Sequence, residues 1–560
     1  MLTDGLDGLD RSAPPVLVVG SGPVGLAVAT RLRARGVPVL LLESGGSGAS
    51  TSVQQLSASE RVEPERHDDT MIAMSRQLGG TSNLWGARCL PYDPIDFEPR
   101  PGIDARWPIG HADLAPYWRP ALEATQAGAP IFDSTDALLP DADFDFSADR
   151  LERWANIQPA QIVHRRAIAE DDGLDVRTHC TAVGLDLDEE GRITGVDVAH
   201  SLSGERARLT PRLTVLAMGG LETTRLLLSA QRERPALFGG AEGPLGRYYM
   251  GHVIGEIADI VLADGQLGRA FDFHVEDGSY VRRRFQPSEE LQRAHGLLNS
   301  AFWPVVPPIA DPRHGDATLS MVYLALCVPP IGRLLTAEAI RLRHMAEGPV
   351  PYGRHFANLL TGGPAAIAFA VHFLRRRYFI KERLPGFFIH NGANRYGLSY
   401  HAEHAPNRDS RIWLDDRRDR LGLPSLRIDL RFGGIDVDSL LRTHDLFEQW
   451  LLRNQAGHLD YRMPREARGE AIMAKAAHGT HQIGLARMGD NRRDAVVDSD
   501  LRCFDASNLY LATTAVLPTS SQANPTLTAV ALALRLGDHL AARLEAPEAV
   551  AATRELAGAR

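Results

Sequence analysis

The first part of the chain places short, wholly apolar runs next to helical patterns, which is typical of a parallel sheet covered by helices. We predict buried strands at 16–19 and 37–42, with an alanine- and leucine-rich helix between them. A third apolar run, 213–216, precedes two glycines and a helix from Leu221. Because these runs lie far apart in the sequence, we expect a Rossmann-like sheet assembled from distant segments.

Other segments alternate apolar and polar positions, which predicts antiparallel structure. Residues 181–187, 193–198 and 206–210 alternate with polar turns and indicate a small antiparallel meander. Further strands are expected at 411–414 and 425–430, followed by a helix from about Asp436 to Asn454. Residues 255 to about 400 have the weakest pattern, and we assign them to a substrate-facing region.

The apolar run nearest to membrane-spanning length is 365–374, which His372 interrupts. It is too short to cross about 30 Å of hydrocarbon. We expect Pro364 to begin this helix and Arg375–Arg377 to complement the dipole at its C-terminus. Burial in the core is the expected environment, with a dimer contact or a membrane-surface contact as the alternatives.

Charge and cysteine content indicate which partners and sites are not expected for this protein. The 61 Lys and Arg residues against 70 Asp and Glu give a net charge of -9, which argues against a nucleic-acid partner. The acidic N-terminus lacks a recognisable targeting signal, so a cytoplasmic location is expected and a membrane partner is not. Four cysteines are scattered without metal-ligand spacing: Cys89, Cys180, Cys327 and Cys503.

A Gly-x-Gly-x-x-Gly turn joins the first strand to its helix. Gly20 allows the tight turn, Gly22 lets the backbone approach a pyrophosphate, and Gly25 lets the helix pack close to the strand. Glu43 ends the second strand, where its carboxylate would accept hydrogen bonds from a ribose 2′-hydroxyl and repel a 2′-phosphate. The turn therefore predicts a dinucleotide cofactor other than NADP.

Two further segments point to the same cofactor. Residues 75–88 combine glycines and small hydroxyls with Trp85, a composition suited to a backbone held against a flat ligand. Gly219 and Gly220 form a second corner between a strand and a helix.

The C-terminal part holds the candidate chemistry. His478 and His481 lie among small residues, and histidine is the side chain that most readily exchanges protons near neutral pH. A strand and a polar loop then lead into a helix, with Asn524 expected at its N-cap and Pro525 at its first position. The N-terminus of that helix suits the negative edge of a reduced flavin.

Taken in order, these segments resemble the glucose-methanol-choline (GMC) oxidoreductases across nearly the whole chain. The Gly219–Thr223 corner and the Gly246–Met250 segment also match the family. The Trp107–Ile109 region and the Ala523–Thr526 ending are most similar to bacterial members and pyranose oxidases, which act on sugars or polyols. The resemblance implies FAD as cofactor and the oxidation of an alcohol group to a carbonyl.

The resemblance also implies a mixed α/β (α+β) fold, in which a discontinuous substrate-binding domain is built on an antiparallel sheet. We expect an FAD-binding domain at 13–254 that includes the meander near 176–210, and a substrate-binding domain at 255–475. A segment at 476–545 would complete the FAD domain and active site, followed by a tail at 546–560. The residues expected to contact FAD are Gly20, Gly22, Pro23, Val24, Gly25, Glu43, Ser44, Gly80, Thr81, Asn83, Leu84, Trp85, Gly86, Val183, Ala217, Gly219, Asn524, Pro525 and Thr526.

By its position in the family pattern, His481 matches the catalytic histidine and Asn524 the second active-site residue, whereas His478 has no counterpart. The hypothesis is that neutral His481 takes the hydroxyl proton while the hydride moves to flavin N5, and that Asn524 orients the same oxygen. Asn83 or Leu84 stands where some relatives carry a histidine that attaches FAD covalently, so non-covalent FAD is expected.

Several functions stay open at the level of the sequence. The enzyme could instead be a lyase of this family with a structural FAD, a non-catalytic FAD-binding scaffold, or an NAD-dependent dehydrogenase, since the first turn does not separate NAD from FAD. The substrate is expected to be a small alcohol or sugar. The electron acceptor is O₂ or a quinone or other carrier, and a homo-oligomer is an open alternative. No metal site is expected.

Overall fold

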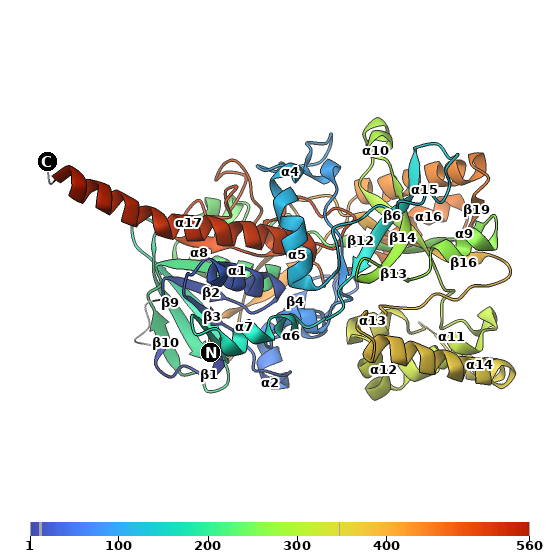
Figure 1. Cartoon of the computed structure of the whole chain (residues 1–560), viewed down its shortest axis with the longest axis horizontal. Coiled ribbons are helices and arrows are strands. Elements are labelled where there is room, and N and C mark those ends of the chain that lie inside the picture. The colour runs from blue at the N-terminus through green and yellow to red at the C-terminus, as the bar shows by residue number, and fades with distance from the viewer. Residues whose placement is uncertain (1, 10–13, 347, 559–560) are drawn as a thin grey trace.

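A computed structural model describes residues 2–9, 14–346 and 348–558 (Figure 1). One half of the molecule is built on a parallel sheet and the other on an antiparallel sheet, and a group of four helices lies beside the antiparallel half (Figure 1). The fold is therefore mixed α/β, as predicted.

The parallel sheet has six strands from four distant parts of the chain. Their order is β1 (Leu2–Asp4), β7 (Leu174–Thr178), β3 (Val39–Leu42), β2 (Val16–Val19), β11 (Leu213–Leu216) and β20 (Leu509–Leu511). The predicted strands 16–19 and 213–216 pair in parallel, with Val16 opposite Leu213. The edge strand β1 and its neighbour β7 were not predicted, because they are short and only partly apolar.

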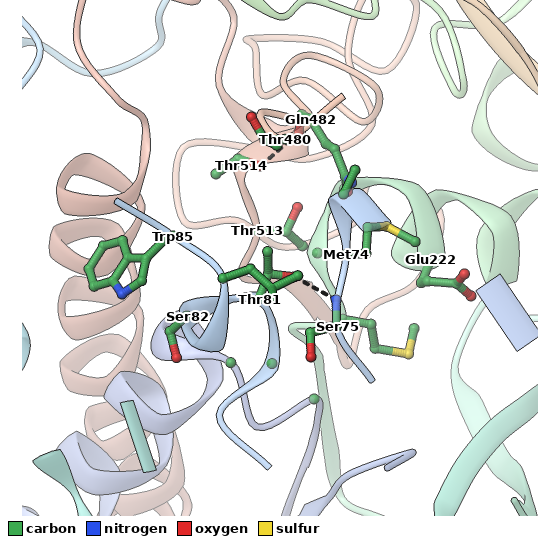
Figure 2. A pocket seen from close by; sticks show the side chains of 18 of the residues that line it. Met74, Ser75, Thr81, Ser82, Trp85, Glu222, Thr480, Gln482, Thr513 and Thr514 are labelled. Atoms are coloured by element: carbon green, nitrogen blue, oxygen red, sulfur yellow. Dashed lines mark hydrogen bonds between the residues drawn. The ribbon is translucent and has the colours of Figure 1, made fainter. Parts of the chain in front are cut away.

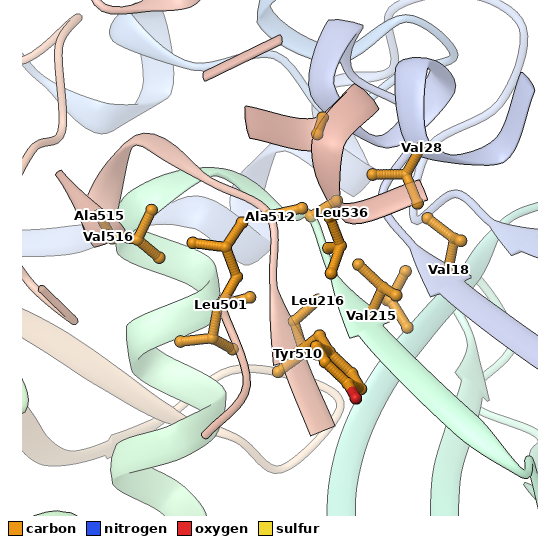
Figure 3. Close-up of a cluster of buried hydrophobic side chains, with 14 of the residues drawn as sticks. Val18, Val28, Val215, Leu216, Leu501, Tyr510, Ala512, Ala515, Val516 and Leu536 are labelled. Carbon is orange, nitrogen blue, oxygen red and sulfur yellow. The ribbon is translucent and has the colours of Figure 1, made fainter. Parts of the chain in front are cut away.

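A helix follows each of the two glycine corners, and a third helix packs beside the first. Helix α1 (Pro23–Ala34) packs against α17 (Thr526–Gly558), and α8 (Gly219–Glu233) follows the second glycine corner. Side chains of β2, β11, β20 and α17 meet in one buried cluster, shown in Figure 3, which includes Val18, Val215 and Leu536. Helix α17 extends well past the predicted end near Leu544.

Two small sheets flank the cofactor side. The predicted meander is confirmed as β8 (Cys180–Leu187), β9 (Ile193–His200) and β10 (Arg206–Leu209), all antiparallel. The strands predicted near 411 and 425 are β17 (Arg411–Arg418) and β18 (Pro424–Asp429), and β4 (Ser59–Arg61) pairs with β18.

The second large sheet carries the antiparallel half. Its order is β19 (Gly457–Tyr461), β12 (His252–Leu262), β16 (Arg395–Glu403), β15 (Ser300–Val305), β14 (Ser279–Pro287), β6 (Phe146–Trp154) and β5 (Arg88–Cys89), with β13 (His274–Glu276) beside β14. Helix α15 (Gly434–Arg453), predicted from about Asp436 to Asn454, covers it and packs Phe447 against Phe302. The sheet uses residues on both sides of 254, and the predicted domain limits stay predictions.

Four helices, α11 (Ala317–Cys327), α12 (Pro329–Leu335), α13 (Glu338–Arg343) and α14 (Tyr352–Tyr378), form the lobe beside this sheet (Figure 1). Two predictions about the apolar run at 365–374 are wrong. Pro364 lies inside α14 instead of beginning it, because the helix starts a full twelve residues earlier at Tyr352. Burial in the core is also wrong, because among the described residues of α14 only His355 and Ala366 are buried.

The expectation that no segment reaches membrane-spanning length is also corrected. By length and composition alone, α14 is one helix that could cross a membrane, with a mean hydropathy of 1.4 over its best window and only 6% of that window buried. The bent pair α11 and α12 would pass the same test as one broken span. The apolar run at 365–374 is only part of this helix, which begins at Tyr352.

Candidate functional site

A cavity of about 500 Å³ runs from the glycine turn to the C-terminal histidines. Its walls come from the parallel sheet, the 75–88 segment, the β8 strand and the loop before α17. Figure 2 shows how Thr81, Trp85, Thr513 and Thr514 line it from different parts of the chain. The two predicted halves of the site therefore share one cavity.

The glycine turn is shaped by close backbone packing. Gly20 has a φ of +105°, and a Cβ there would lie 2.5 Å from the Ala217 carbonyl oxygen. A Cβ on Gly25 would lie 1.9 Å from the Gly20 oxygen, so Gly25 holds α1 against the turn. Gly22 differs, because it lines the cavity and a Cβ there would meet no atom within 4 Å. That open space at the start of α1 fits a pyrophosphate held at a helix N-terminus.

Glu43 lies at the same end of the cavity and is buried. Its carboxylate accepts hydrogen bonds from the Ser21 backbone N–H (3.1 Å), the Ser21 hydroxyl (2.5 Å) and the Gly45 N–H (2.8 Å). Burial raises the pKa of this carboxyl, an effect that the hydrogen bonds oppose. A carboxylate has about four acceptor positions, so one stays available for a ribose hydroxyl. The donor set thus fits a dinucleotide whose ribose is not phosphorylated.

The central part of the cavity is walled by small polar side chains and backbone. The Thr81 hydroxyl accepts from the Ser75 N–H (3.3 Å), and Thr514 donates to the Gln482 carbonyl (2.7 Å), as drawn in Figure 2. The Trp85 indole N–H donates to the Gln158 carbonyl (2.7 Å), which fixes the ring. Such a wall suits a flat, polar-edged ring system.

Most of the residues predicted to contact FAD line this cavity. They are Gly20, Gly22, Pro23, Val24, Glu43, Ser44, Gly80, Thr81, Leu84, Trp85, Gly86, Ala217, Gly219, Asn524 and Thr526. Gly25, Asn83, Val183 and Pro525 are not among its lining residues. Asn83 instead donates to the Leu78 and Gly80 carbonyls, so it shapes the loop behind the wall.

Several lining residues were not predicted. Arg76 and Arg225 bring positive charge to the central wall, where Arg76 pairs with Glu222 at 2.6 Å. Thr181 and Ala182, at the start of β8, line the cavity and the predicted Val183 does not, and the register of β8 against β9 shifts between Ala182 and Gly184.

The reactive end of the cavity brings His481 and Asn524 together. The Asn524 Nδ2 amide lies 3.2 Å from His481 Nε2, and both side chains line the cavity. Burial, together with the charges of Arg88 and Arg343, lowers the pKa of His481 to about 3. The imidazole is therefore neutral near neutral pH.

Backbone carbonyls assign the tautomer of His481 through a second histidine, His252, on β12. His252 Nε2 lies 3.1 Å from both the Ser520 and Ala523 carbonyl oxygens, which can only accept. Nε2 of His252 therefore carries the proton, and its Nδ1 is an acceptor. Since His481 Nδ1 lies 2.9 Å from that atom, His481 is protonated on Nδ1 and its Nε2 lone pair faces Asn524.

Arg88, on β5, sets the orientation of Asn524. Its Nε donates to the Asn524 Oδ1 oxygen at 2.7 Å, so the Asn524 amide must present its NH₂ group to His481. Glu152 lies 3.1 Å from Arg88 Nη1 and keeps the guanidinium paired. The Arg88 Nη2 atom is buried and has no hydrogen-bond partner among the described residues.

Two more histidines, His401 and His478, complete a cluster with His252 and His481. Their ligating nitrogens lie within 4.8 Å of one another, as in a metal site. None of the four groups is a carboxylate, and the charges of Arg88 and Arg343 act on the cluster. His401 Nδ1 lies 2.6 Å from the Gln522 carbonyl oxygen and is committed to it. The cluster is therefore suited to holding protons in defined places, and poorly suited to a divalent cation.

The chain is similar to known proteins both in sequence and in fold. Residues 15–240 match the family model described as FAD dependent oxidoreductase, and residues 406–533 match GMC oxidoreductase. The chain is 22% identical to a 2-methyl-1,2-propanediol dehydrogenase of Mycolicibacterium austroafricanum, over 94% of this chain and 95% of the relative. It is 25% identical to a 6'''-hydroxyparomomycin C oxidase of Streptomyces lividus, over 95% and 92%.

A similar solved structure is pyridoxine 4-oxidase from Mesorbium loti, with a TM-score of 0.55 and 15% identity. The match covers 94% of this chain and 99% of that one. The chain therefore shares its overall fold with that structure.

Proposed function

Because the chain belongs to the glucose-methanol-choline (GMC) oxidoreductases, whose cofactor is FAD, we propose that it oxidises an alcohol group of a neutral polyol, sugar or glycoside to a carbonyl. The observation that carries the proposal is the pair His481 and Asn524, 3.2 Å apart in the cavity that begins at the glycine turn. A bound FAD would supply the hydride acceptor.

Within this proposal the chain itself holds the cofactor and handles one proton. Gly22 leaves room for the pyrophosphate, Glu43 holds the ribose, and the start of α17 lies next to the reactive end. We propose that FAD is held without a covalent bond. Asn83 and Leu84, in the segment where some relatives attach FAD, have no side chain able to form that link.

His481 acts as the base in this scheme. Its Nε2 atom has no proton and points toward Asn524, so it is placed to accept the hydroxyl proton of an alcohol. As the C–H bond breaks, the proton bound at Nε2 makes His481 cationic. His252 Nδ1 then accepts a stronger hydrogen bond from His481 Nδ1, which stabilises that state.

Asn524 and Arg88 orient the alcohol. The Asn524 NH₂ group, which now donates to His481, would donate to the substrate oxygen instead, with Arg88 holding the amide in place. The positive charge of Arg88, which lines the cavity, lies near the oxygen on which negative charge develops. The alcohol oxygen is therefore oriented by Asn524, while the base accepts its proton.

Charge at the cavity favours a neutral substrate. The names of two relatives include a diol and an aminoglycoside. In this chain the lining side chains around the reactive end include Arg88 and Arg343. The lining carboxylates Glu222 and Asp419 are paired with Arg76 and Arg225. The two arginines are themselves paired with Glu152 and Asp68, so a polycationic aminoglycoside would meet no unpaired carboxylate among these side chains, and a neutral polyol or sugar needs none.

The test is an anaerobic screen for bleaching of the flavin absorbance. Neutral diols, sugars and glycosides should bleach the wild-type flavin, and an aminoglycoside should do so far more slowly. His481→Ala should retain FAD but reduce it about 10²- to 10⁴-fold more slowly, and added imidazole should restore part of the rate. A flavin that stays oxidised with every alcohol while substrate is consumed would favour the lyase alternative.

Cofactor identity and attachment are tested by one release experiment. Acid precipitation should leave the yellow colour in the supernatant, and a coloured pellet would contradict non-covalent binding. Absence of the flavin absorbance bands from the purified protein, together with NAD-dependent activity, would favour the dehydrogenase alternative.

A further inference from the structure

Helix α14 exposes one continuous apolar stripe. Besides Tyr352 in its first turn, its exposed large apolar side chains are Phe356, Leu360, Ile367, Val371, Leu374 and Tyr378. At about 100° per residue, these six positions fall within about 60° of one another around the helix. Leu360 is 88% exposed, and Ile367 and Val371 are each 64% exposed. A stripe this regular and this open on a folded protein marks an interaction surface.

The opposite side of α14 is held to the protein by specific contacts. His355 Nδ1 and Asn358 Nδ2 lie 3.1 and 3.0 Å from the Ser320 hydroxyl of α11. A Cβ on Gly362 would lie 2.8 Å from the Ala317 Cβ, so the two helices are in close contact there. Phe369 packs edge-on against Phe387. Helix α14 is thus fixed lengthwise along the lobe, with its apolar stripe facing outward.

The lobe has the opposite charge to the rest of the chain. Residues 317–385 contain nine Lys or Arg and three Asp or Glu, a net charge of +6 in a chain whose total is -9. At the end of the stripe, Arg375 and Lys381 are exposed to solvent. Exposed apolar side chains on α12 and α13, Leu334 and Leu342, extend the apolar character of the lobe.

The same lobe borders the cavity. Ile340 and Arg343 of α13 line the cavity wall, and Arg343 pairs with Asp68 across it. Whatever the lobe binds is therefore close to one wall of the candidate active site.

From these observations we propose that the α11–α14 lobe docks the enzyme on an anionic phospholipid surface, with α14 lying in the plane of the interface. An apolar stripe bordered by arginine and lysine is the composition of a helix that rests on such a surface. Each basic side chain near an anionic leaflet contributes about 1 kcal/mol. A second copy of this chain fits less well, because a two-fold contact would bring two lobes of net charge +6 together.

The contacts of α14 favour an orientation in the plane of the membrane surface over one that crosses the bilayer. A spanning α14 would have to leave α11 and expose His355, Asn358 and Arg354 to hydrocarbon. Docking in the interface keeps those contacts and buries only the stripe.

The test is co-sedimentation of the full-length, flavin-loaded enzyme with vesicles. We expect binding to vesicles that mix phosphatidylglycerol with phosphatidylcholine, weaker binding to phosphatidylcholine alone, and release at high salt or alkaline carbonate. The double variant Leu360→Glu with Val371→Glu should bind at least about ten-fold more weakly. Arg375→Gln with Lys381→Gln should weaken binding to the anionic vesicles selectively.

Leu452→Glu is the matched control, because Leu452 on α15 is 56% exposed outside the lobe. It should bind as the wild type does, and all variants should oxidise alcohol in solution at the wild-type rate. The proposal would be overturned if the wild-type protein bound neither vesicle type. It would also be overturned if Leu452→Glu weakened vesicle binding as much as the α14 double variant does. Binding that resists carbonate would overturn the flat orientation. A lipid-free dimer dissociated by Leu360→Glu, without vesicle binding, would assign the stripe to self-association.

Discussion

His481 Nδ1 lies 2.9 Å from His252 Nδ1, so one of two neutral imidazoles must donate to the other. The carbonyl oxygens of Ser520 and Ala523 decide which, because they already bind the proton on His252 Nε2. The base nitrogen that faces the cavity is therefore specified by backbone atoms two hydrogen bonds away. His252 acts through His481 and does not itself reach the substrate position.

Substitution of His252 tests this relationship. His252→Phe keeps a ring of similar size but removes the acceptor for His481 Nδ1, so we expect kcat to fall about 10- to 100-fold with KM little changed. His252→Gln can accept from His481 and donate to the carbonyls, and should restore part of kcat. Rates of anaerobic flavin reduction, at equal FAD content, measure both. Equal loss in the two variants would assign His252 a packing role only.

The pH dependence of activity should reflect the low pKa of His481. Because that pKa is about 3, the base stays neutral well below neutral pH, and kcat/KM should lose no activity to its protonation until strongly acidic pH. Arg88→Met removes a positive charge, so the pKa of His481 should rise toward the ordinary value of about 6.5. An acidic limb should then enter the pH profile.

Arg88→Lys separates charge from orientation. It retains the positive charge but not the geometry that holds Asn524 Oδ1 at 2.7 Å. We expect a lower kcat without the new acidic limb. If the acidic limb of the pH profile appears equally in Arg88→Met and Arg88→Lys, the charge of Arg88 does not control the pKa of His481.

The parts of this site that could be predicted are those that a local sequence pattern marks. Strand β2, the corner at Gly219 and the pair His481 and Asn524 follow from apolar runs, glycines and the family pattern. His481 and Asn524 are 43 residues apart, yet the match of each to a motif was enough to place them in one site.

Arg88, His252 and His401 could not be predicted in this way. They lie on β5, β12 and β16 of the antiparallel sheet, where buried polar residues interrupt the alternation that marks strands. Which of those side chains faces the cavity depends on the pairing of strands that lie far apart in sequence, as His252 and its partner Glu403 do. The same limit explains α14, because hydropathy identifies an apolar helix but does not say whether another element covers it.

The glycine turn offers a prediction that separates cofactor binding from folding. Gly22→Ala adds a methyl group in open space that lines the cavity, so the apoprotein should keep its thermal midpoint while FAD affinity falls about 10- to 100-fold. Gly25→Ala places its Cβ 1.9 Å from the Gly20 oxygen and should destabilise the fold itself. Gly48→Ala, at an exposed position with no atom within 4 Å, is the control and should change neither property. Unchanged FAD affinity in Gly22→Ala would remove the pyrophosphate from this turn.

His444 gives a prediction for stability. It is buried in α15, donates to the Leu440 carbonyl (2.8 Å) and packs edge-on against Phe302, and burial lowers its pKa to about 4. Above about pH 6.5 neither the folded nor the unfolded state protonates this side chain. As the pH falls from 6.5 toward 4, only the unfolded state binds the proton, so stability is lost by about 1.4 kcal/mol per pH unit.

His444→Leu should therefore weaken the pH dependence of unfolding in that window. The urea midpoint of the variant should fall less steeply between about pH 6.5 and about pH 4 than that of the wild type. Measurement near pH 8 isolates the packing effect of the substitution, because the charge makes no contribution there. Since His67 and His164 also have pKa values lowered to about 4 by burial, the variant should retain part of the acid sensitivity. A wild-type slope in the variant would mean that His444 is not held neutral in the folded state.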